Sequence, residues 1–196
     1  MRGGLPMLAR TLAIAGLIAF IAPGALADDE DSFVREAGYL AISGVGAFEQ
    51  IGKSLEREVN PSDGGGLSVR AGYRMFRYAS IEVEGEWVYE LGSGLKNPYN
   101  ITCNLRFYYP MGPQDRIQPY AIGGIGVSVP NVNGDNHVTG GWRAGVGVDY
   151  YINEHWSVGP SASWVSTVSN DPALAYVSVQ LGVQYLFGAS EDEGGL

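Results

Sequence analysis

The chain of 196 residues is acidic: 12 Lys and Arg stand against 21 Asp and Glu, which gives a formal net charge of -9. Such a chain is a poor partner for nucleic acid or for anionic lipid headgroups. Its single cysteine, Cys103, excludes an internal disulfide. Its 29 glycines follow no three-residue period, which excludes a collagen-like chain.

The first 27 residues have the layout of a cleavable secretory signal peptide. Arg2 and Arg10 give a charged start, residues 11–22 form an apolar stretch, and residues 25–27 supply an A-x-A cleavage site. The apolar stretch is too short for a membrane helix, which needs about 20 residues. We therefore expect an exported protein. Cleavage after Ala27 removes two arginines and no acidic residue, leaving 169 residues with a net charge of -11.

An acidic N-terminal segment, 28–37, is followed by eight segments in which apolar and polar residues alternate. These segments are 38–48, 66–75, 79–90, 99–109, 117–129, 138–151, 155–165 and 176–187. Most have about ten or more residues, the length of strands that cross a bilayer. The pattern predicts an all-β fold, an eight-stranded antiparallel up-and-down transmembrane β-barrel over 38–187, with an acidic C-terminal tail at 188–196.

The connections between these segments alternate in length. Short turns lie near residues 77, 113 and 153, whereas the longer connections are 49–65, 91–98, 130–137 and 166–175. Long loops at one end and short turns at the other are typical of outer-membrane barrels. We expect the long loops outside the cell, with the turns and both termini in the periplasm.

Charged residues collect on one face of the alternating segments. In the third segment, Glu82, Glu84 and Glu86 alternate with apolar neighbours such as Val83 and Trp87. An eight-stranded barrel has an interior just wide enough for side chains to fill. We expect a lumen filled by ion pairs in which four arginines balance four carboxylates. These residues are Arg70, Arg74, Glu82, Glu84, Glu86, Arg106, Arg143 and Asp149.

The same alternation would also suit a soluble, lipocalin-like barrel that buries its apolar face inside. Aromatic residues near the ends of the apolar faces favour the membrane arrangement, because aromatic girdles lie at both membrane interfaces. They are Tyr73, Trp87, Tyr89, Tyr109, Trp142, Tyr150, Trp156, Trp164, Tyr185 and Phe187.

Residues 118–129 (QPYAIGGIGVSV), residues 141–159 (GWRAGVGVDYYINEHWSVG) and the closing aromatic strand resemble the small outer-membrane β-barrel family. This family includes the OmpA barrel domain and the opacity-type surface proteins of Gram-negative bacteria. The resemblance implies an outer-membrane location among lipid and lipopolysaccharide. It also implies a last strand, ending at Phe187, that the outer-membrane insertion machinery reads.

The strongest enzymatic motif is His155-Trp156-Ser157, which would place a base and a nucleophile on one face of a strand. It resembles the His/Ser pair of outer-membrane lipid A deacylases, although Val158 stands where that family has Asn. The expected topology puts His155 at the periplasmic end, away from the outer leaflet. We therefore expect no enzymatic activity.

Metal and cofactor sites have weak support in the sequence. Glu82, Glu84 and Glu86 could hold a cation, but their alternation with arginines on other segments favours ion pairs. Residues 131–137 (NVNGDNH) have the composition of an ordinary turn. We expect no cofactor and no metal.

Two non-enzymatic functions remain open. The barrel could have a structural or surface-interaction role of the adhesin type, with a surface ligand bound mainly by loop 49–65. The charges of that loop would then either contact the ligand or only keep the loop solvated. The alternative is a narrow channel for small solutes.

Overall fold

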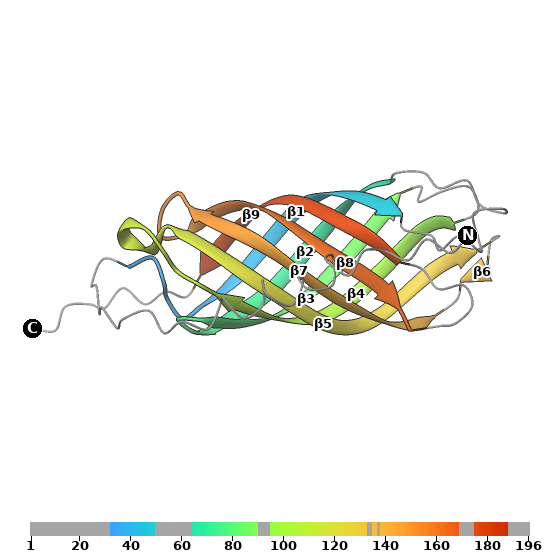
Figure 1. Ribbon diagram of the computed structural model, residues 1–196, viewed down its shortest axis with the longest axis horizontal. Coiled ribbons are helices and arrows are strands. Elements are labelled where there is room, and N and C mark those ends of the chain that lie inside the picture. The colour runs from blue at the N-terminus through green and yellow to red at the C-terminus, as the bar shows by residue number, and fades with distance from the viewer. Residues whose placement is uncertain are drawn as a thin grey trace, which may run out of the picture. The chain divides into compact units, whose positions relative to one another are not determined.

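Strands make up nearly all of the regular structure in the computed structural model of the chain (Figure 1). It describes residues 32–49, 64–89, 95–132, 135–136, 138–168 and 175–187, all of which belong to one structural unit, Asp31–Leu196. The signal peptide, most of loop 49–65 and the tail at 188–196 lie outside these residues. None of the helices among the described residues is long and apolar enough to cross a membrane.

The strands follow one another along the chain with one short helical turn between them. They are β1 (Ala37–Glu49), β2 (Gly64–Phe76), β3 (Ala79–Tyr89), β4 (Leu95–Tyr108), the 3₁₀ turn η1 (Pro113–Asp115), β5 (Ile117–Val132), β6 (Asp135–Asn136), β7 (Thr139–Tyr151), β8 (Trp156–Thr167) and β9 (Ala175–Phe187).

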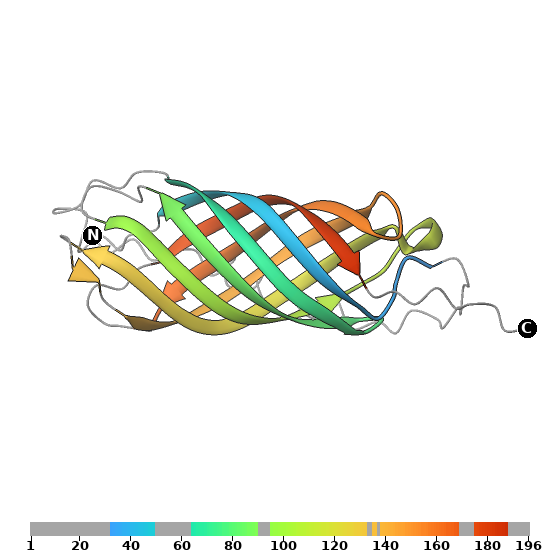
Figure 2. The same cartoon turned by 180° about the vertical axis from the view of Figure 1, so that it is seen from behind.

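Eight of these strands close into an antiparallel up-and-down barrel (Figures 1 and 2). Each pairs with the next along the chain, and β1 pairs with β9 from Gly38 opposite Phe187 to Glu49 opposite Tyr176. Within the part of the chain that the structure describes, the two-residue strand β6 pairs with the end of β5. The fold predicted from the sequence is confirmed, and the barrel begins at Ala37, one residue earlier than predicted.

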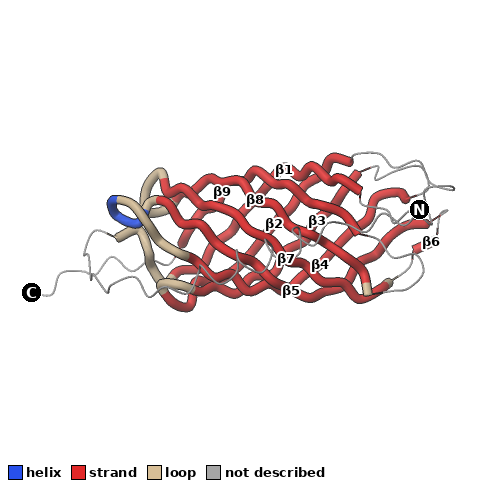
Figure 3. The backbone as a smooth tube through the Cα atoms, in the orientation of Figure 1, coloured by secondary structure: helices blue, strands red, loops and turns tan. Residues whose placement is uncertain are grey.

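The barrel has two different ends. The turns 77–78, 109–116 and 152–155 lie at one end, together with the start of β1 and the end of β9 (Figure 3). We call it the turn end. The loop end lies opposite, where β1 leads toward β2, β3 toward β4, β5 toward β7 and β8 toward β9.

Strand pairing extends further at the loop end than predicted. Leu95 of β4 pairs with Val132 of β5, and Asn131 and Val132 of β5 also pair with β6. Residues 95–98 and 130–132 were expected in loops, which was wrong. Their polar and proline residues suggested a loop, but a backbone ladder needs only matched N–H and C=O groups.

Polar residues face inward and apolar residues face outward in the barrel. Along β3, the buried residues Ser80, Glu82, Glu84 and Glu86 alternate with residues such as Val83, which is 52% exposed. On the other barrel strands the outward residues are likewise mainly apolar. The inward residues are mainly polar, except on β1, where Ser43 is the one polar residue among inward Ala37, Tyr39, Ala41, Val45 and Ala47. The lipocalin-like arrangement, with the outward apolar set inside, is therefore not the one that forms.

Exposed aromatic residues surround the barrel near both ends. Tyr73, Tyr150, Trp156, Tyr185 and Phe187 lie toward the turn end, and Trp87, Tyr89, Trp142 and Trp164 lie toward the loop end. Each sits on the outer face of its strand, as in the interfacial girdles of outer-membrane barrels.

Apolar side chains fill the inside of the barrel at both ends, and polar side chains fill its middle. At the loop end the buried cluster is Val45, Ala47, Val88, Val165 and Tyr176. At the turn end it is Phe33, Ala37, Tyr39, Tyr151 and Leu186, next to a smaller cluster of Tyr108, Tyr120 and Ile122. The charged residues predicted for the lumen lie between these clusters or against them.

Candidate functional site

The candidate site is the charged lumen. The structure places all eight charged residues predicted for it inside the barrel, and each is at most 5% exposed. They come from β2, β3, β4 and β7, because alternate residues of a strand point to the same face. Burying eight charged groups is costly unless each is paired or hydrogen-bonded, so their contacts determine what the site can do.

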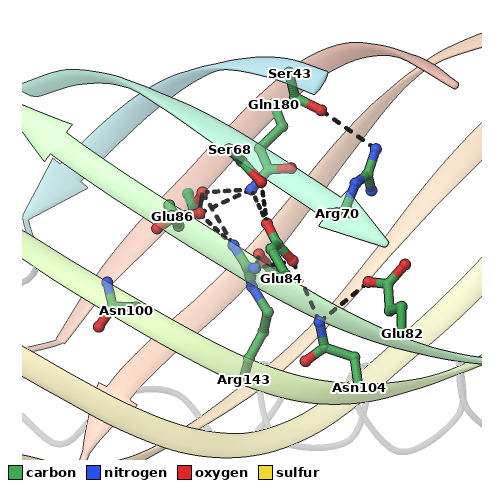
Figure 4. Close-up of polar contacts among 12 residues, drawn as sticks. Ser43, Ser68, Arg70, Glu82, Glu84, Glu86, Asn100, Asn104, Arg143 and Gln180 are labelled. Carbon is green, nitrogen blue, oxygen red and sulfur yellow. Dashed lines mark hydrogen bonds and ion pairs between the residues drawn. The ribbon is translucent and has the colours of Figure 1, made fainter. Parts of the chain in front are cut away.

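Arg143 joins two carboxylates across the lumen (Figure 4). It lies on β7, and its Nη1 meets Oε2 of Glu84 while its Nη2 lies 2.5 Å from Oε2 of Glu86, both on β3. Its Nε donates to Ser163 Oγ at 2.9 Å. One guanidinium reaches both carboxylates because residues 84 and 86 point to the same face.

Neutral side chains complete the bonding of these two carboxylates. Gln180 Nε2 donates to Glu84 Oε1 and to Glu86 Oε2, at 2.8 Å in each case. Ser68 Oγ donates to Glu84 at 2.6 Å, and Ser178 Oγ donates to Glu86 at 2.8 Å. A buried network in which the acceptors are satisfied rigidifies its surroundings.

A second ion-pair group surrounds Arg106 of β4. Its Nε lies 2.8 Å from Glu82 Oε2 and its Nη1 lies 3.5 Å from Asp149 Oδ2. Its guanidinium also stacks over the ring of Tyr120, 4.3 Å from the ring centroid. Glu82 in turn accepts hydrogen bonds from Tyr39 and from Asn104.

Arg70 and Arg74 depart from the predicted ion pairing. Among the described residues, neither lies within ion-pair distance of a carboxylate, so the expectation of four matched pairs was wrong for these two. Arg74 donates to Gln118 Oε1 at 2.5 Å and to the carbonyl of Arg77 at 2.6 Å. Arg70 donates to Ser43 Oγ at 3.2 Å (Figure 4).

The ladder pairing explains why a sequence-based pairing fails at Arg70. Arg70 lies directly opposite Glu84 in the β2–β3 ladder, where cross-strand neighbours normally interact. However, Ser68, Gln180 and Arg143 already bond the Glu84 carboxylate. The guanidinium of Arg70 turns toward β1 instead.

Three residues important to the network received no role from the sequence. Gln180 bridges two carboxylates, Tyr39 bonds Glu82, and Tyr176 donates to Glu86 while accepting from Asn100. In the sequence, the one indication of a role for these residues is that strand alternation places them on the inward face. Alternation identifies the face but not which neighbour across the lumen each side chain meets.

The His155-x-Ser157 pair does not form a catalytic pair, contrary to the geometry considered for it. β8 begins at Trp156, so His155 lies in the preceding turn and does not share the strand alternation. Its ring is exposed and stacks on Tyr185, whereas Ser157 is fully buried inside the barrel. The base and the nucleophile therefore lie in different environments.

The described residues offer no cluster of three or more metal-ligating side chains. The carboxylates of Glu82, Glu84 and Glu86 are bonded by arginine, amide and hydroxyl donors, which leaves no set of oxygens free for a cation. The turn at 131–137 has side chains outside the described set. Cys103 is exposed on the outer face of β4.

The sequence from residue 12 to residue 187 matches the family described as outer membrane protein beta-barrel domain. The chain belongs to this family. An inward polar face, an outward apolar face and barrel closure are what such a protein requires in a bilayer. The signal peptide at 1–27 stays a prediction, since these findings do not test it.

Solved structures share the fold of this outer-membrane barrel at low sequence identity. Neisserial surface protein A is 13% identical with a TM-score of 0.61, covering 76% of this chain and 97% of its own. The barrel domain of OprF from Pseudomonas aeruginosa is 15% identical (TM-score 0.54; 78% and 100% covered). OprG from the same organism is 16% identical (TM-score 0.53; 81% and 100% covered). No curated protein gives a significant match.

Proposed function

We propose that this outer-membrane barrel is a non-enzymatic surface protein with a structural or adhesin-like role, and that it contacts its partners through the connections at its loop end. The observation that carries this proposal is the occupied lumen. Charged and polar side chains fill the middle of the barrel, and apolar clusters fill both of its ends.

The occupied lumen disfavours a solute channel. A solute moving from end to end would have to displace Tyr176 and Val88 at the loop end, the Arg143 pairs in the middle, and Tyr39 and Tyr151 at the turn end. Each of these side chains is at most 3% exposed. Function then falls to the surface, where connecting segments vary freely on a rigid scaffold.

Conductance in planar bilayers tests the proposal against the channel alternative. We expect the purified, folded protein to give no discrete current steps, while an open porin in the same membrane serves as the positive control. Reproducible steps from the wild-type protein would favour the narrow small-solute channel and would count against a purely surface role.

A loop replacement tests the surface part of the proposal. Residues 50–63 carry Lys53, Glu56, Arg57, Glu58 and Asp63, a dense set of charges for a single connection. Exchange of 50–63 for a short Gly/Ser turn should leave the barrel folded and reduce the adhesion of cells that display it. A second variant with the same loop length but neutral residues separates the charges from the length. Unchanged adhesion in both variants would remove this loop from the proposal.

The deacylase alternative has its own test. His155→Ala and Ser157→Ala variants should leave the acylation of lipid A unchanged in cells that make the protein, because the two side chains do not meet. A loss of deacylation in either variant would overturn the non-enzymatic proposal.

A further inference from the structure

The segment before the first strand covers the turn end of the lumen. Phe33 is 8% exposed and belongs to the buried cluster with Ala37, Tyr39, Tyr151 and Leu186. Its ring stacks on Tyr151, with 6.3 Å between centroids and 11° between planes. The guanidinium of Arg116 lies over the Phe33 ring, 4.9 Å from its centroid.

The turn from β4 to β5 holds this segment in place. Ser32 Oγ donates to Asp115 Oδ2 at 2.7 Å, and the Phe33 amide donates to the carbonyl of Gln114 at 3.0 Å. Asp115 also pairs with Arg77 at 2.7 Å, which ties the turn to β2 and β3. A further ion pair joins Arg35 to Glu154 of the turn before β8, at 2.9 Å.

The backbone of that turn is strained where it meets the segment. Gln114 and Asp115 have φ values of 58° and 55°, a left-handed conformation that few residues other than glycine adopt. Such strain persists only where the surrounding structure imposes it, and it concentrates at functional positions. Here it accompanies the two hydrogen bonds that the turn accepts from Ser32 and Phe33.

The attachment of residues 32–36 differs in kind from the attachment of the strands. From Gly38 onward, β1 is paired on both sides, with β2 and with β9. Residues 32–36 belong to no strand, and the bonds described for them are side-chain contacts and a single backbone hydrogen bond to the β4–β5 turn. Residues 32–36 can therefore move away from the turn end of the lumen without breaking the backbone hydrogen bonds between the strands of the barrel.

We propose that residues 32–36 form a displaceable segment, here called the latch, that closes the lumen at the turn end. Phe33 is the plug, because its ring fills this end, and the hydrogen bonds from Ser32 to Asp115 and from the Phe33 amide to Gln114 hold the latch closed. The closed latch keeps water out of the turn-end cluster. When it opens, the inner face near Ala37 meets the aqueous phase while the eight strands stay paired. This inference concerns the barrel itself and holds whether or not the loop end binds a partner.

Thiol accessibility tests the latch. In a Cys103→Ala background, Ala37→Cys places a reporter beneath Phe33, at a position that is 1% exposed. The folded protein in vesicles is treated with a charged, water-soluble thiosulfonate. We expect slow but measurable labelling with the latch intact, and labelling faster by about tenfold or more in Phe33→Ala, because labelling tracks the population of the open form.

Two further variants make the result decisive. Phe76→Ala removes an exposed aromatic ring from the same end of the barrel and should leave the rate unchanged. Ser32→Ala combined with Arg35→Ala removes outer contacts of the latch without touching its plug and should accelerate labelling to a smaller degree. Circular dichroism confirms that each variant is folded.

Several outcomes would overturn the proposal. Equal labelling rates in the parent, Phe33→Ala and the double variant would mean that the segment does not control access. No labelling of the parent at all would mean a fixed plug. Loss of the folded barrel in Phe33→Ala would mean that the segment is an essential part of the fold, which a displaceable latch is not.

Discussion

At the scale of single residues, the contacts of each buried arginine determine how its charge is stabilised inside the barrel. Arg143 serves two carboxylates, whereas Arg70 serves none among the described residues and donates to Ser43. Both arginines are nearly fully buried. The two positions therefore separate the effect of burying a guanidinium from the effect of pairing it.

We predict that Arg143→Met destabilises the barrel by about 3–5 kcal/mol, because it leaves Glu84 and Glu86 buried without their cation. Arg70→Met, the matched control, should cost about 1 kcal/mol or less, since it removes one hydrogen bond. The measurement is the free energy of unfolding from urea titration in lipid vesicles. Equal losses for the two variants would contradict the pairing described for the lumen.

The sequence predicts the place of these residues but not their partners. Strand alternation puts Arg143 and Glu84 on the polar face of their strands. The strand lengths and the aromatic residues near the strand ends favour a membrane barrel in which that face is the inner one. The contact between Arg143 and Glu84 joins β7 to β3, which are not neighbours in the sheet. Such a contact depends on how the closed barrel staggers its strands, and a pattern read along one strand at a time carries no information about that.

At the scale of elements, the positions of the inner surface divide between long side chains and glycines that leave room for them. Strands β2, β3 and β4 carry three of the four lumen arginines and all three lumen glutamates. Strands β5 and β7 carry inward glycines such as Gly124 and Gly147, and a Cβ on Gly147 would lie 2.4 Å from the Tyr120 hydroxyl. The glycines make room for side chains that reach across from neighbouring strands.

Two adjacent glycines of β5 test this division. A Cβ on Gly124 would lie 2.0 Å from Asn104 Oδ1 and 2.6 Å from the Cys103 carbonyl, whereas a Cβ on the outward Gly123 meets nothing within 4 Å. We predict that Gly124→Ala costs about 1–3 kcal/mol through overpacking, while Gly123→Ala is neutral or slightly stabilising. Unfolding in vesicles compares them directly. A larger loss of stability in Gly123→Ala than in Gly124→Ala would mean that Gly123, and not Gly124, faces the lumen.

Element boundaries show where local sequence is a weak guide. The latch falls in the segment 28–37, which composition identifies only as acidic, and residues 32–36 have no strand alternation to indicate that they cover the barrel. The extension of β4 and β5 past their predicted ends is also invisible to an apolar/polar pattern. In both cases the position is set by contacts with elements distant in the sequence, such as Asp115 with Ser32.

For the whole molecule, the distribution of polarity is the reverse of that in a soluble domain. Leu181 in the middle of β9 is 68% exposed, while its neighbour Gln180 is 3% exposed. In water, a barrel with this distribution of polarity would expose a large apolar surface, which monomeric proteins rarely do. In a bilayer the same surface is satisfied by lipid, and every strand of the closed barrel has its backbone partners.

The depth dependence of an added charge tests this arrangement. We predict that Leu181→Arg, at the middle of a spanning strand, destabilises the barrel in vesicles by about 2–4 kcal/mol, whereas Phe76→Arg at the turn end costs about 0–1 kcal/mol, because a cation is costly at the bilayer midplane and tolerated at its interface. Both side chains are strongly exposed, at 68% and 63%, so packing loss is small at each. Urea titration in vesicles gives both values.

The difference between the two variants should shrink when the titrations are repeated in bilayers of shorter lipids. The thinner hydrocarbon layer lets the arginine at 181 reach the headgroups by snorkelling. If Leu181→Arg and Phe76→Arg cost the same free energy of unfolding in each bilayer, the apolar band of the barrel does not lie in the hydrocarbon layer.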